Sequence, residues 1–404
     1  IMEKKRLFIG SFIENNRSDE VWKNSKTGLV FSGDLFQKSL LNGFNNYPHF
    51  IDYIINAPSI GSFPLRYKKM YFPISHFEFG SIDGVNCGFM NFTYFKKYDI
   101  YLSIKRKALV WAKKNINNER TIILYSLLEP YLKAAIAVKN KYPDTHICCI
   151  VLDLPEFFND SKSLLSGYLS KRGNKRINYL TPNIDSFILL TEHMANALNI
   201  QGVKPWILIE GIYLPRSRNS VEKEKKTILY TGKLDRRFGI TEMIDAFISI
   251  PDKDYRLWIC GDGSDRIEVE KAVKQDNRII YFGVVKQEQV LDMQTKATLL
   301  INPRKGDDEY TKYSFPSKTM EYMASGTPTV MYKLQGIPEE YNNYLIIVPD
   351  NKKETLKNTL MKWCSKDQME LDQFGEYAKK FILNKKTATI QSGKIVDFLN
   401  LIRK

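Results

Sequence analysis

A segment in the second half of the chain combines a helix start with residues that bind anions and hydroxyl groups. Within residues 309–328, Pro316 and Ser317 are typical first residues of a helix, whose first-turn N–H groups lack intrahelical acceptors. Those N–H groups, the Ser317 hydroxyl and the Lys318 ammonium form a candidate phosphate site. Glu321 lies about one turn further on and can accept hydrogen bonds from a vicinal diol such as ribose. The segment predicts a ligand with a phosphate and sugar hydroxyls; the plain alternative is a capped helix with a surface glutamate.

A second candidate anion site is the loop at residues 232–239, which reads Gly-Lys-Leu-Asp-Arg-Arg-Phe-Gly. It follows an apolar, strand-like run and carries the basic side chains of Lys233, Arg236 and Arg237. Guanidinium groups clamp diphosphate oxygens through bidentate, charge-assisted hydrogen bonds. We therefore expect the loop to hold a diphosphate. The alternative is a strand-to-helix turn with a solvated cationic rim.

A glycine pair, Gly261 and Gly263, ends another apolar run and would let a phosphate approach the backbone closely. The pair does not belong to the dinucleotide-binding fingerprint, because Asp265 and Arg266 stand where the third glycine is needed. Turns of this kind are also common without any ligand.

The elements that must position these residues alternate regularly through the second half of the chain. Apolar runs end at glycine or Asn-Pro and are separated by segments with helical spacing, as in parallel βαβ units. The expected strands are 227–231, 256–260, 278–282, 298–301 and 328–332, and the expected helices are 240–248, about 264–275 and 318–325. This pattern predicts a doubly wound parallel sheet.

Parts of the first half show the same alternation of apolar strands and helical segments. The expected strands are 5–13, 121–125, 146–152 and 186–190, and the expected helices are 35–44, 129–141 and 191–198. Residues 60–100 are rich in aromatic residues and glycine, and their periodicity predicts no clear elements.

A polar, charged run at residues 215–226 lies between two apolar segments, as a linker would. We therefore expect two domains over 1–212 and 227–380, a linker at 213–226, and a C-terminal helical segment at 381–404 that packs back toward the N-terminal domain. The fold class is α/β, with two Rossmann-like doubly wound domains facing a central cleft and ligands at the carboxyl ends of the strands.

Composition narrows the class of protein further. The chain has 404 residues, is 43% hydrophobic, and has no run of 18 apolar residues that would predict a transmembrane helix. A charged start at residues 2–6 precedes only a short apolar run that meets Glu14, which favours a first strand over a signal peptide. Five scattered cysteines without a Cys-x-x-Cys pattern favour neither disulfides nor a zinc site, and a cytoplasmic location is expected.

The net charge of +15 is spread over the chain, with 27 basic and 18 acidic residues in 1–210 and 33 and 27 in 211–404. Local clusters stand at 66–69, 105–114 and 171–176. Because no nucleic-acid-binding signature is present, phosphorylated or membrane-borne substrates are the expected partners rather than nucleic acid. A solvated lysine-rich surface is the alternative for each cluster.

The segment 315–328, Phe-Pro-Ser-Lys-Thr-Met-Glu-Tyr-Met-Ala-Ser-Gly-Thr-Pro, closely resembles the donor-site signature of family-4 retaining glycosyltransferases of the GT-B fold. Residues 230–234, 261–263 and 282–284 resemble other landmarks of that family's donor domain, in the same order. The resemblance is specific over about 180–350 and thin over 1–170. It points most to bacterial enzymes that build capsule, exopolysaccharide or O-antigen repeat units.

The resemblance implies a role for each matching residue. Glu321 would bind the nucleotide ribose, the backbone amides at 315–317 with Lys318 would hold the diphosphate, and the backbone near Val284 would receive the base. A basic residue of the 233–237 loop, Arg237 or Lys233, would stabilise the leaving phosphate. The donor-binding set is Gly232, Gly261, Gly263, Val284, Thr311, Tyr313, Phe315, Pro316, Ser317, Lys318 and Glu321.

The sequence also departs from the family pattern. The family commonly has a second glutamate eight positions before Glu321, which contacts the transferred sugar, and here that position is Tyr313. Thr311 or Tyr313 is expected to take over part of this task. The family often has a histidine after a first-domain strand, and Asp153 is the expected substitute unless 152–156 is only a proline-containing turn. Gly10 and Ser11, at the end of the first strand, are the expected acceptor-side residues.

The activity implied is that of a retaining, metal-independent hexosyltransferase without a cofactor. It would move a sugar from a nucleoside-diphosphate sugar, taken as a UDP-sugar, to a saccharide or lipid-linked saccharide acceptor in bacterial surface polysaccharide synthesis. The N-terminal domain would bind the acceptor and the C-terminal domain the donor, with peripheral contact to the inner, anionic face of the cell membrane. Two alternatives stay open: a sugar-nucleotide epimerase of the GT-B fold and a non-catalytic partner subunit.

Overall fold

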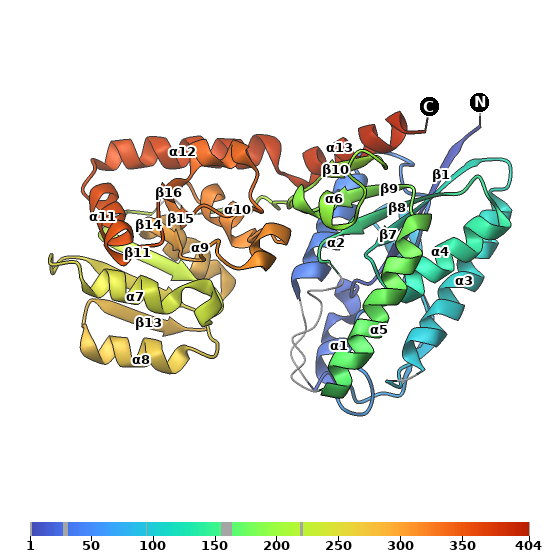
Figure 1. The fold of residues 1–404 in the computed structure, drawn as a ribbon, viewed down its shortest axis with the longest axis horizontal. Helices are drawn as coiled ribbons and strands as arrows, with labels where there is room; N and C mark the ends of the chain where they lie inside the picture. Colours follow the sequence, from blue (N-terminus) through green and yellow to red (C-terminus); the bar gives the residue numbers. More distant parts are fainter. Residues whose placement is uncertain (1, 27–30, 94, 155–163, 219–220, 404) are drawn as a thin grey trace. The chain divides into compact units, whose positions relative to one another are not determined.

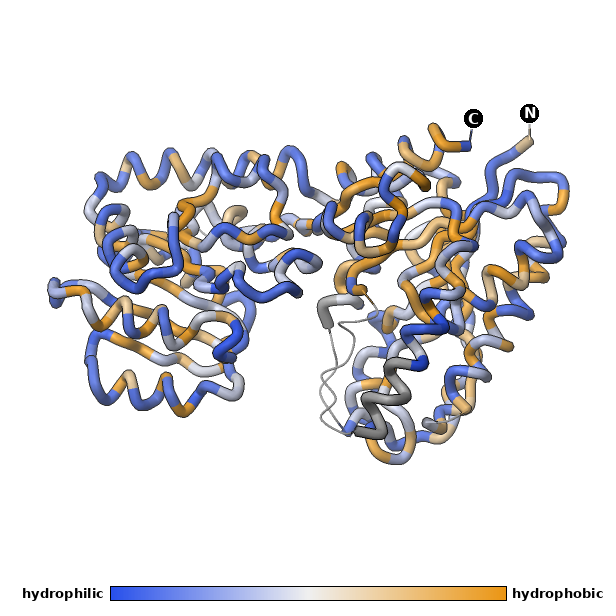
Figure 2. The backbone as a smooth tube through the Cα atoms, in the orientation of Figure 1, coloured by the Kyte–Doolittle hydropathy of each residue, from blue (hydrophilic) through white to orange (hydrophobic). Residues whose placement is uncertain are grey.

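The computed structural model describes residues 2–26, 31–93, 95–154, 164–218 and 221–403. The chain divides into two compact units, one formed by Ile1–Ile212 with Ala388–Lys404 and the other by Tyr213–Thr387 (Figure 1). Each unit is built around its own sheet, and the buried strands form the most hydrophobic parts of the chain (Figure 2).

Unit 1 contains an eight-stranded sheet in the order β10-β9-β8-β7-β1-β2-β5-β4, in which only β4 runs antiparallel to its neighbour. A small β3–β6 ribbon accompanies it. The strands are β1 (Lys4–Gly10), β2 (Tyr53–Asn56), β3 (Tyr71–Phe72), β4 (Ser75–Phe79), β5 (Ile82–Asn86), β6 (Phe89–Met90), β7 (Glu119–Tyr125), β8 (His146–Val151), β9 (Ser186–Leu189) and β10 (Trp206–Leu208).

Helices cover both faces of this sheet. Phe8 of β1 and Ile54 of β2 pack in one core with Leu40 and Leu41 of α2 and with Ile395 of α13. Helices α3, α4 and α5 pack side by side on the opposite face. The helices of unit 1 are α1 (Ser18–Asn24), α2 (Phe31–Phe44), α3 (Lys96–Lys114), α4 (Glu129–Lys141), α5 (Leu164–Leu180), α6 (His193–Ala197) and α13 (Ala388–Leu401).

Unit 2 contains six parallel strands in the order β13-β12-β11-β14-β15-β16. Because β11 is the first strand of the unit, this is the 3-2-1-4-5-6 order of the Rossmann fold, and the chain reverses its direction of winding between β11 and β14. The strands are β11 (Glu224–Thr231), β12 (Arg256–Cys260), β13 (Ile279–Gly283), β14 (Ala297–Asn302), β15 (Thr329–Tyr332) and β16 (Ile346–Val348).

The sheet of unit 2 is also covered on both faces. Helices α7, α8 and α11 bury their apolar stripes against one face, and α9 and α10 pack on the other. In α7, the spacing of Ile240, Met243, Ile244 and Phe247 places all four side chains in the core. The helices are α7 (Ile240–Ile248), α8 (Arg266–Gln275), α9 (Gln287–Lys296), α10 (Ser317–Ala324), α11 (Lys353–Cys364) and α12 (Gln368–Lys385).

The predicted α/β fold class is confirmed, and several boundaries differ from expectation. Strand β11 begins at Glu224, so the last residues of the expected 213–226 linker belong to the sheet. The expected C-terminal segment at 381–404 divides: α12 continues to Lys385 in unit 2, and α13 packs on α2 in unit 1. The first strand ends at Gly10 rather than at residue 13, because the Ile13 N–H donates to Asp34 and no longer to a neighbouring strand.

Two loops at the carboxyl ends of β11 and β12 pack backbone against backbone. The Gly232 N–H donates to the Cys260 carbonyl at 3.0 Å and the Leu234 N–H to the Asp262 carbonyl at 3.0 Å. A Cβ atom at Gly261, where φ is +136°, would lie 1.7 Å from the Gly232 carbonyl oxygen, and one at Gly263 would lie 2.1 Å from that of Leu234. Both glycines are therefore required by the fold of the 232–239 loop, which is a structural reason beside any contact with a ligand.

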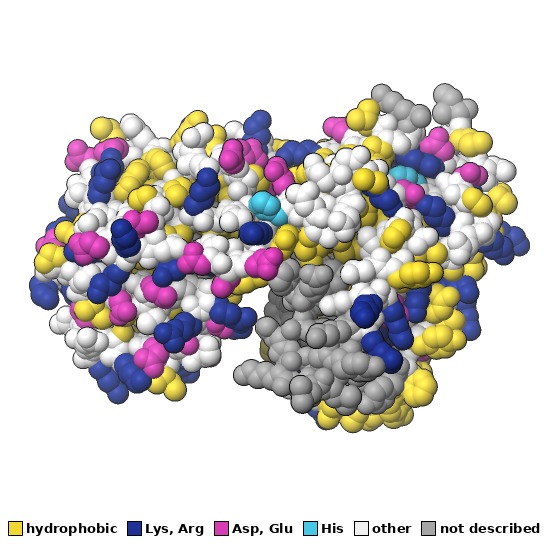
Figure 3. Space-filling model, in the orientation of Figure 1, with side chains coloured by type: hydrophobic (Ala, Val, Ile, Leu, Met, Phe, Trp, Pro, Cys, Tyr) yellow, Lys and Arg dark blue, Asp and Glu magenta, His cyan; other side chains and the backbone are white. Residues whose placement is uncertain are grey.

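The described residues contain no helix long and apolar enough to cross a membrane. All five cysteines are buried and unpaired. Basic side chains are scattered over the visible faces of both units rather than gathered in one block (Figure 3).

We predict that Gly261→Ala destabilises unit 2 by more than about 3 kcal/mol, because the added methyl group meets a carbonyl oxygen that the loop cannot move cheaply. Gly283→Ala is the matched control: Gly283 has φ +66°, yet no atom lies within 4 Å of its added Cβ. Only the left-handed backbone conformation opposes this change, at about 1 to 2 kcal/mol. Denaturant unfolding measures both, and equal losses would contradict the role given to the backbone contact.

We predict a pH-dependent stability that resides in His146. Burial lowers the pKa of its imidazole from 6.5 to about 4, and its Nε2 lies 2.8 Å from the Ser186 hydroxyl. Between pH 6.5 and 4 the unfolded chain binds a proton that the folded chain does not, so stability is lost as the pH falls through this window. His146→Gln should reduce the loss between pH 7 and pH 5 by on the order of 1 to 2 kcal/mol, whereas the exposed His76→Gln should leave it unchanged in the same unfolding measurements.

Candidate donor site of unit 2

Helix α10 begins at the carboxyl edge of the unit 2 sheet, beside the end of β11. Pro316 is its N-cap, and the Thr319 N–H already donates to the Pro316 carbonyl at 2.8 Å. The N–H groups of Ser317 and Lys318 head the helix without intrahelical acceptors and coincide with the positive end of its dipole. The predicted set of amides at 315–317 needs one correction, because proline carries no N–H.

Lys318 and Glu321 lie together on the first turns of α10. The Lys318 ammonium is 3.6 Å from Glu321 Oε1 and donates to the Thr231 hydroxyl at 3.4 Å, so it spans α10 and the end of β11. The lysine side chain is 43% exposed and the glutamate side chain 19% exposed. Both predicted residues therefore lie at one site, where an incoming anion would meet the ammonium first.

A chain of hydrogen bonds orients Glu321. Arg218 donates from Nη1 to Gln294 Oε1 at 3.0 Å and from Nη2 to the Glu321 carbonyl at 3.1 Å. The buried Gln294 in turn donates from Nε2 to Glu321 Oε1 at 2.7 Å. Since these bonds occupy Oε1 alone, the second carboxylate oxygen has no partner among the described residues. Sequence reasoning missed Gln294 and Arg218, since nothing in their local pattern marks them.

The next residue, Tyr322, anchors α10 to the sheet. Its buried hydroxyl accepts from the Thr231 N–H at 2.8 Å and donates to the Thr231 carbonyl at 2.9 Å. Burial raises the pKa of this phenol, which keeps it neutral and able to donate. The position of Glu321 is thereby coupled to the end of β11.

The basic loop after β11 carries its charge on the surface. Arg237 donates from Nε and Nη2 to the two carboxylate oxygens of Asp235 at 3.1 and 3.0 Å, and the Lys233 ammonium lies 4.0 Å from the same carboxylate. These hydrogen bonds lower the pKa of Asp235, which stays ionised. The predicted cations are thus present and half-exposed, and a diphosphate would compete with Asp235 for them.

A buried cation that sequence reasoning missed lies at the end of β14. Arg304 is 7% exposed, donates from Nη2 to the Ser314 hydroxyl at 2.8 Å, and lies over the ring of Tyr310 at 4.5 Å. Its Nε has no hydrogen-bond partner, and no carboxylate of the described residues lies within ion-pair distance. Burial lowers the pKa of Arg304, Tyr310 and Asp308 act in the opposite direction, and the nearby Arg237 acts in the same direction as burial. The only signal in the sequence was a basic residue directly after the Asn-Pro strand end.

The loop between β14 and α10 does not place all predicted residues toward a ligand. The Thr311 side chain is fully buried and its hydroxyl donates to the Asp308 carbonyl at 2.6 Å, so it cannot take over sugar contacts in this conformation. The Phe315 ring is buried against Tyr341. Tyr313 is half-buried at the end of the short 3₁₀ helix Glu309–Tyr313. At the end of β13, Val284 is 79% exposed.

In unit 1 the predicted acceptor-side residues are enclosed. The Ser11 side chain is buried, its N–H donates to Gln37 Oε1 at 2.8 Å, and its hydroxyl accepts from Gln37 Nε2 at 3.1 Å. The Gly10 carbonyl accepts from the Tyr131 hydroxyl at 3.2 Å. Asp153 follows β8 with its side chain reaching solvent, yet loss of hydration raises the pKa of its carboxyl. Residues 155–163 lie outside the described part of the chain.

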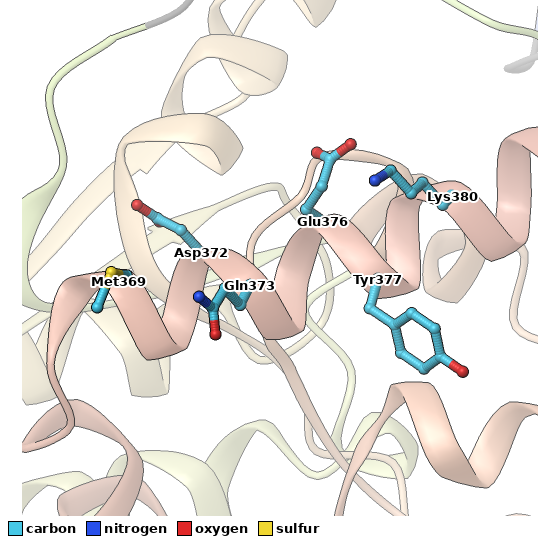
Figure 4. A pocket seen from close by; sticks show the side chains of 6 residues that line it. All are labelled: Met369, Asp372, Gln373, Glu376, Tyr377 and Lys380. Carbon is cyan, nitrogen blue, oxygen red and sulfur yellow. The ribbon is translucent and has the colours of Figure 1, made fainter.

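A pocket of about 590 Å³ elsewhere in unit 2 contains none of these residues. Its lining side chains all come from α12 and point in different directions from the helix (Figure 4): Met369, Asp372, Gln373, Glu376, Tyr377 and Lys380. Such an arrangement offers no convergent set of polar groups. Among the described residues, no group of three or more histidine, cysteine, aspartate or glutamate side chains is arranged to hold a metal ion.

Comparisons with known proteins agree with this geometry. Residues 215–381 match the family of glycosyl transferases group 1, whereas no curated protein sequence matches the chain. Among solved structures, the chain is similar to sucrose-phosphate synthase from Thermosynechococcus elongatus (TM-score 0.63, 13% identity, 98% of this chain and 99% of that chain). It has the same scores and coverage against Anabaena HepE in complex with UDP.

A further similar structure is the apo form of the lipopolysaccharide outer core galactosyltransferase WaaB (TM-score 0.59, 13% identity, 98% of this chain and 99% of that chain). At such low identity these structures establish the fold alone, and the family match covers residues 215–381. The chain therefore has the GT-B fold, with two Rossmann-like units, and its residues 215–381 match the family of glycosyl transferases group 1.

Proposed function

We propose that the chain is a retaining glycosyltransferase that needs neither metal nor cofactor and transfers a sugar from a UDP-sugar. The acceptor is a saccharide or lipid-linked saccharide, and the product belongs to bacterial surface polysaccharide synthesis. UDP in the similar HepE structure supports the nucleotide, and the similarity to WaaB supports the class of product. The single observation that carries the proposal is the meeting of Lys318, Glu321 and the start of α10 at the β11–β14 switch point.

The proposed binding of the donor follows from the chemistry of each group. The free carboxylate oxygen of Glu321 accepts from the ribose hydroxyls, while the N–H groups of Ser317 and Lys318 bind the diphosphate. The backbone at Val284 receives the base. Four cations, Lys233, Arg237, Arg304 and Lys318, compensate the charge of the diphosphate, which is the task that a divalent ion performs in other transferases.

In the proposed reaction the bond between the anomeric carbon and the β-phosphate oxygen breaks as the acceptor oxygen bonds to the same face of that carbon. The positive charge of the oxocarbenium-like transition state is stabilised by the departing diphosphate, and the cations stabilise the charge that develops on UDP. The acceptor hydroxyl gives its proton to a phosphate oxygen. Configuration is retained without a protein nucleophile, and UDP leaves.

We place the acceptor on unit 1, near Gly10, Ser11 and Asp153, because these follow strands at the carboxyl edge of its sheet. We further propose a cytoplasmic enzyme that contacts the anionic inner leaflet through exposed apolar side chains beside basic ones. Leu65 is 78% exposed next to the exposed Arg66, and Phe95 is 67% exposed and close in sequence to the exposed Lys97. Such surfaces combine burial of apolar groups in the interface with attraction to lipid headgroups.

The overall proposal is tested by incubating the full chain with UDP-, GDP- and dTDP-sugars, with and without EDTA, and measuring release of the nucleoside diphosphate. UDP release that EDTA does not reduce is the expected result, and the anomeric configuration of the product, read by NMR, tests retention. A folded chain that binds no nucleotide sugar would instead favour a non-catalytic partner subunit.

We predict that Glu321→Ala weakens UDP binding by 10- to 100-fold, because hydrogen bonds to a charged group contribute about 1.5 to 3 kcal/mol. Glu321→Gln keeps an acceptor oxygen and should lose less. Isothermal titration calorimetry measures the affinity, with Glu354→Ala on α11 as the control for loss of an exposed carboxylate. Unchanged UDP affinity in the Glu321→Ala variant would contradict the assignment of Glu321 to the ribose site.

We predict that Arg304→Met weakens UDP binding by about tenfold or more but leaves uridine binding within twofold, since only the diphosphate neutralises this buried charge. Arg304→Lys, which keeps the charge, should recover part of the loss. The ratio of the two affinities separates the electrostatic role from a structural one. If the Met variant lowers both affinities equally and also lowers Tm, Arg304 acts only in packing.

A further inference from the structure

Unit 1 contains a cavity of about 560 Å³ that none of the proposed donor-side or acceptor-side residues lines. Helix α3 forms one wall through Arg106, Lys107, Val110, Trp111 and Lys114. Their spacing of three and four residues places all five on one side of the helix. Of the basic residues within 105–114, Arg106, Lys107 and Lys114 line the cavity. Lys105 and Lys113 do not.

The opposite wall comes from the sheet, where Lys5, Tyr53 and His76 line the cavity. Lys5 lies near the start of β1, and Tyr53 begins β2. The cavity is therefore at the amino ends of these parallel strands, whereas Gly10 is the last residue of β1 and Ser11 follows it. It is a separate place from the acceptor position proposed above.

The charges around the cavity are unbalanced. Asp52 is the one acidic lining residue among those described; it is already 3.2 Å from the Lys5 ammonium and accepts the Arg6 N–H at 2.6 Å. No described carboxylate lies within ion-pair distance of Arg106, Lys107 or Lys114. Three cations thus face one space without counter-charges, and an anion there would relieve their mutual repulsion.

Apolar groups share this space with the cations. Val110 is 58% and Ile74 is 53% exposed, and both line the cavity. Trp111 is 6% exposed, and its indole N–H has no hydrogen-bond partner, although a buried indole N–H normally finds one. An inorganic anion would leave the apolar wall in water, and a neutral apolar ligand would leave three cations uncompensated.

We propose that this cavity is a second binding site, for an amphiphilic organic phosphate. The phosphate or diphosphate group binds Arg106, Lys107 and Lys114, and the apolar group packs on Val110, Trp111 and Ile74. The same chemistry is offered by the headgroup of an anionic lipid and by a soluble phosphorylated amphiphile. The site does not depend on the proposed transfer reaction, since the residues that form it belong to unit 1 alone and to none of the donor-binding set.

Calorimetry on the full chain tests the proposal, with geranyl diphosphate as the soluble probe and saturating UDP present to occupy the donor site. Arg106→Gln/Lys114→Gln should weaken probe binding at least tenfold, because it removes two charge-assisted contacts. Lys105→Gln/Lys113→Gln is the matched control: it removes the same charge from the same helix outside the cavity. It should change the affinity less than twofold.

The membrane arm uses vesicles of phosphatidylglycerol with the same two double variants. Loss of binding in the cavity variant alone, for the soluble probe or for vesicles, supports the site and identifies the source of the phosphate. Equal losses in both variants would reduce the effect to general charge and overturn the proposal. Displacement of geranyl diphosphate by UDP, or no binding in either arm, would overturn it as well, and neither outcome bears on sugar transfer.

Discussion

The contact on which the candidate donor site depends is the close approach of the Gly232 carbonyl to Gly261, where no side chain fits. It joins the ends of β11 and β12, and the Gly261 N–H, which donates to the Gly283 carbonyl at 2.7 Å, extends the contact to β13. Because the basic 232–239 loop begins at this junction, its course over the sheet edge is set by backbone packing. Gly261 and Gly263 resemble a phosphate-binding motif, but the backbone packing of the fold already requires glycine at both positions.

The cations of unit 2 differ in whether they already have a charged partner in the absence of a ligand. Arg237 already has the Asp235 carboxylate, so a diphosphate must exchange with an existing partner there. Arg304 has no such partner and is buried beside Tyr310, whose hydroxyl is also without a hydrogen bond. Burying a cation without an ion-pair partner costs desolvation free energy. The Tyr310 ring and the Ser314 hydroxyl compensate part of this cost. The strongest demand for an anion in unit 2 is therefore at the end of β14.

The elements and site residues that were predicted correctly depend on interactions between residues close in sequence, and those that were missed depend on contacts between distant residues. Strands β11 to β15 and helix α7 were predicted closely, because apolar runs with clear ends and a clear helical period are local signals, whereas the short β16 was not predicted. The elements of residues 60–100 were not predicted, since this segment forms short strands in two antiparallel pairs, β3–β6 and β4–β5, and the start of α3. Likewise Lys318 and Glu321 are neighbours in sequence, whereas Gln294 meets Glu321 only through tertiary packing. Thr311 lies near the site in sequence, but its hydroxyl donates to the Asp308 carbonyl within its own loop, a contact that the sequence pattern does not reveal.

The orientation of Glu321 can be argued from donors and acceptors alone. A guanidinium only donates, so the Arg218 Nη1 contact requires the carboxamide oxygen of Gln294 to face it. The Gln294 amide NH₂ must then point the other way, toward Glu321, where it meets an acceptor. The carboxylate is thereby held through one oxygen while its second oxygen stays available. Arg218 lies just before β11, in the expected linker, so the segment that connects the units also aligns the residue proposed to bind ribose.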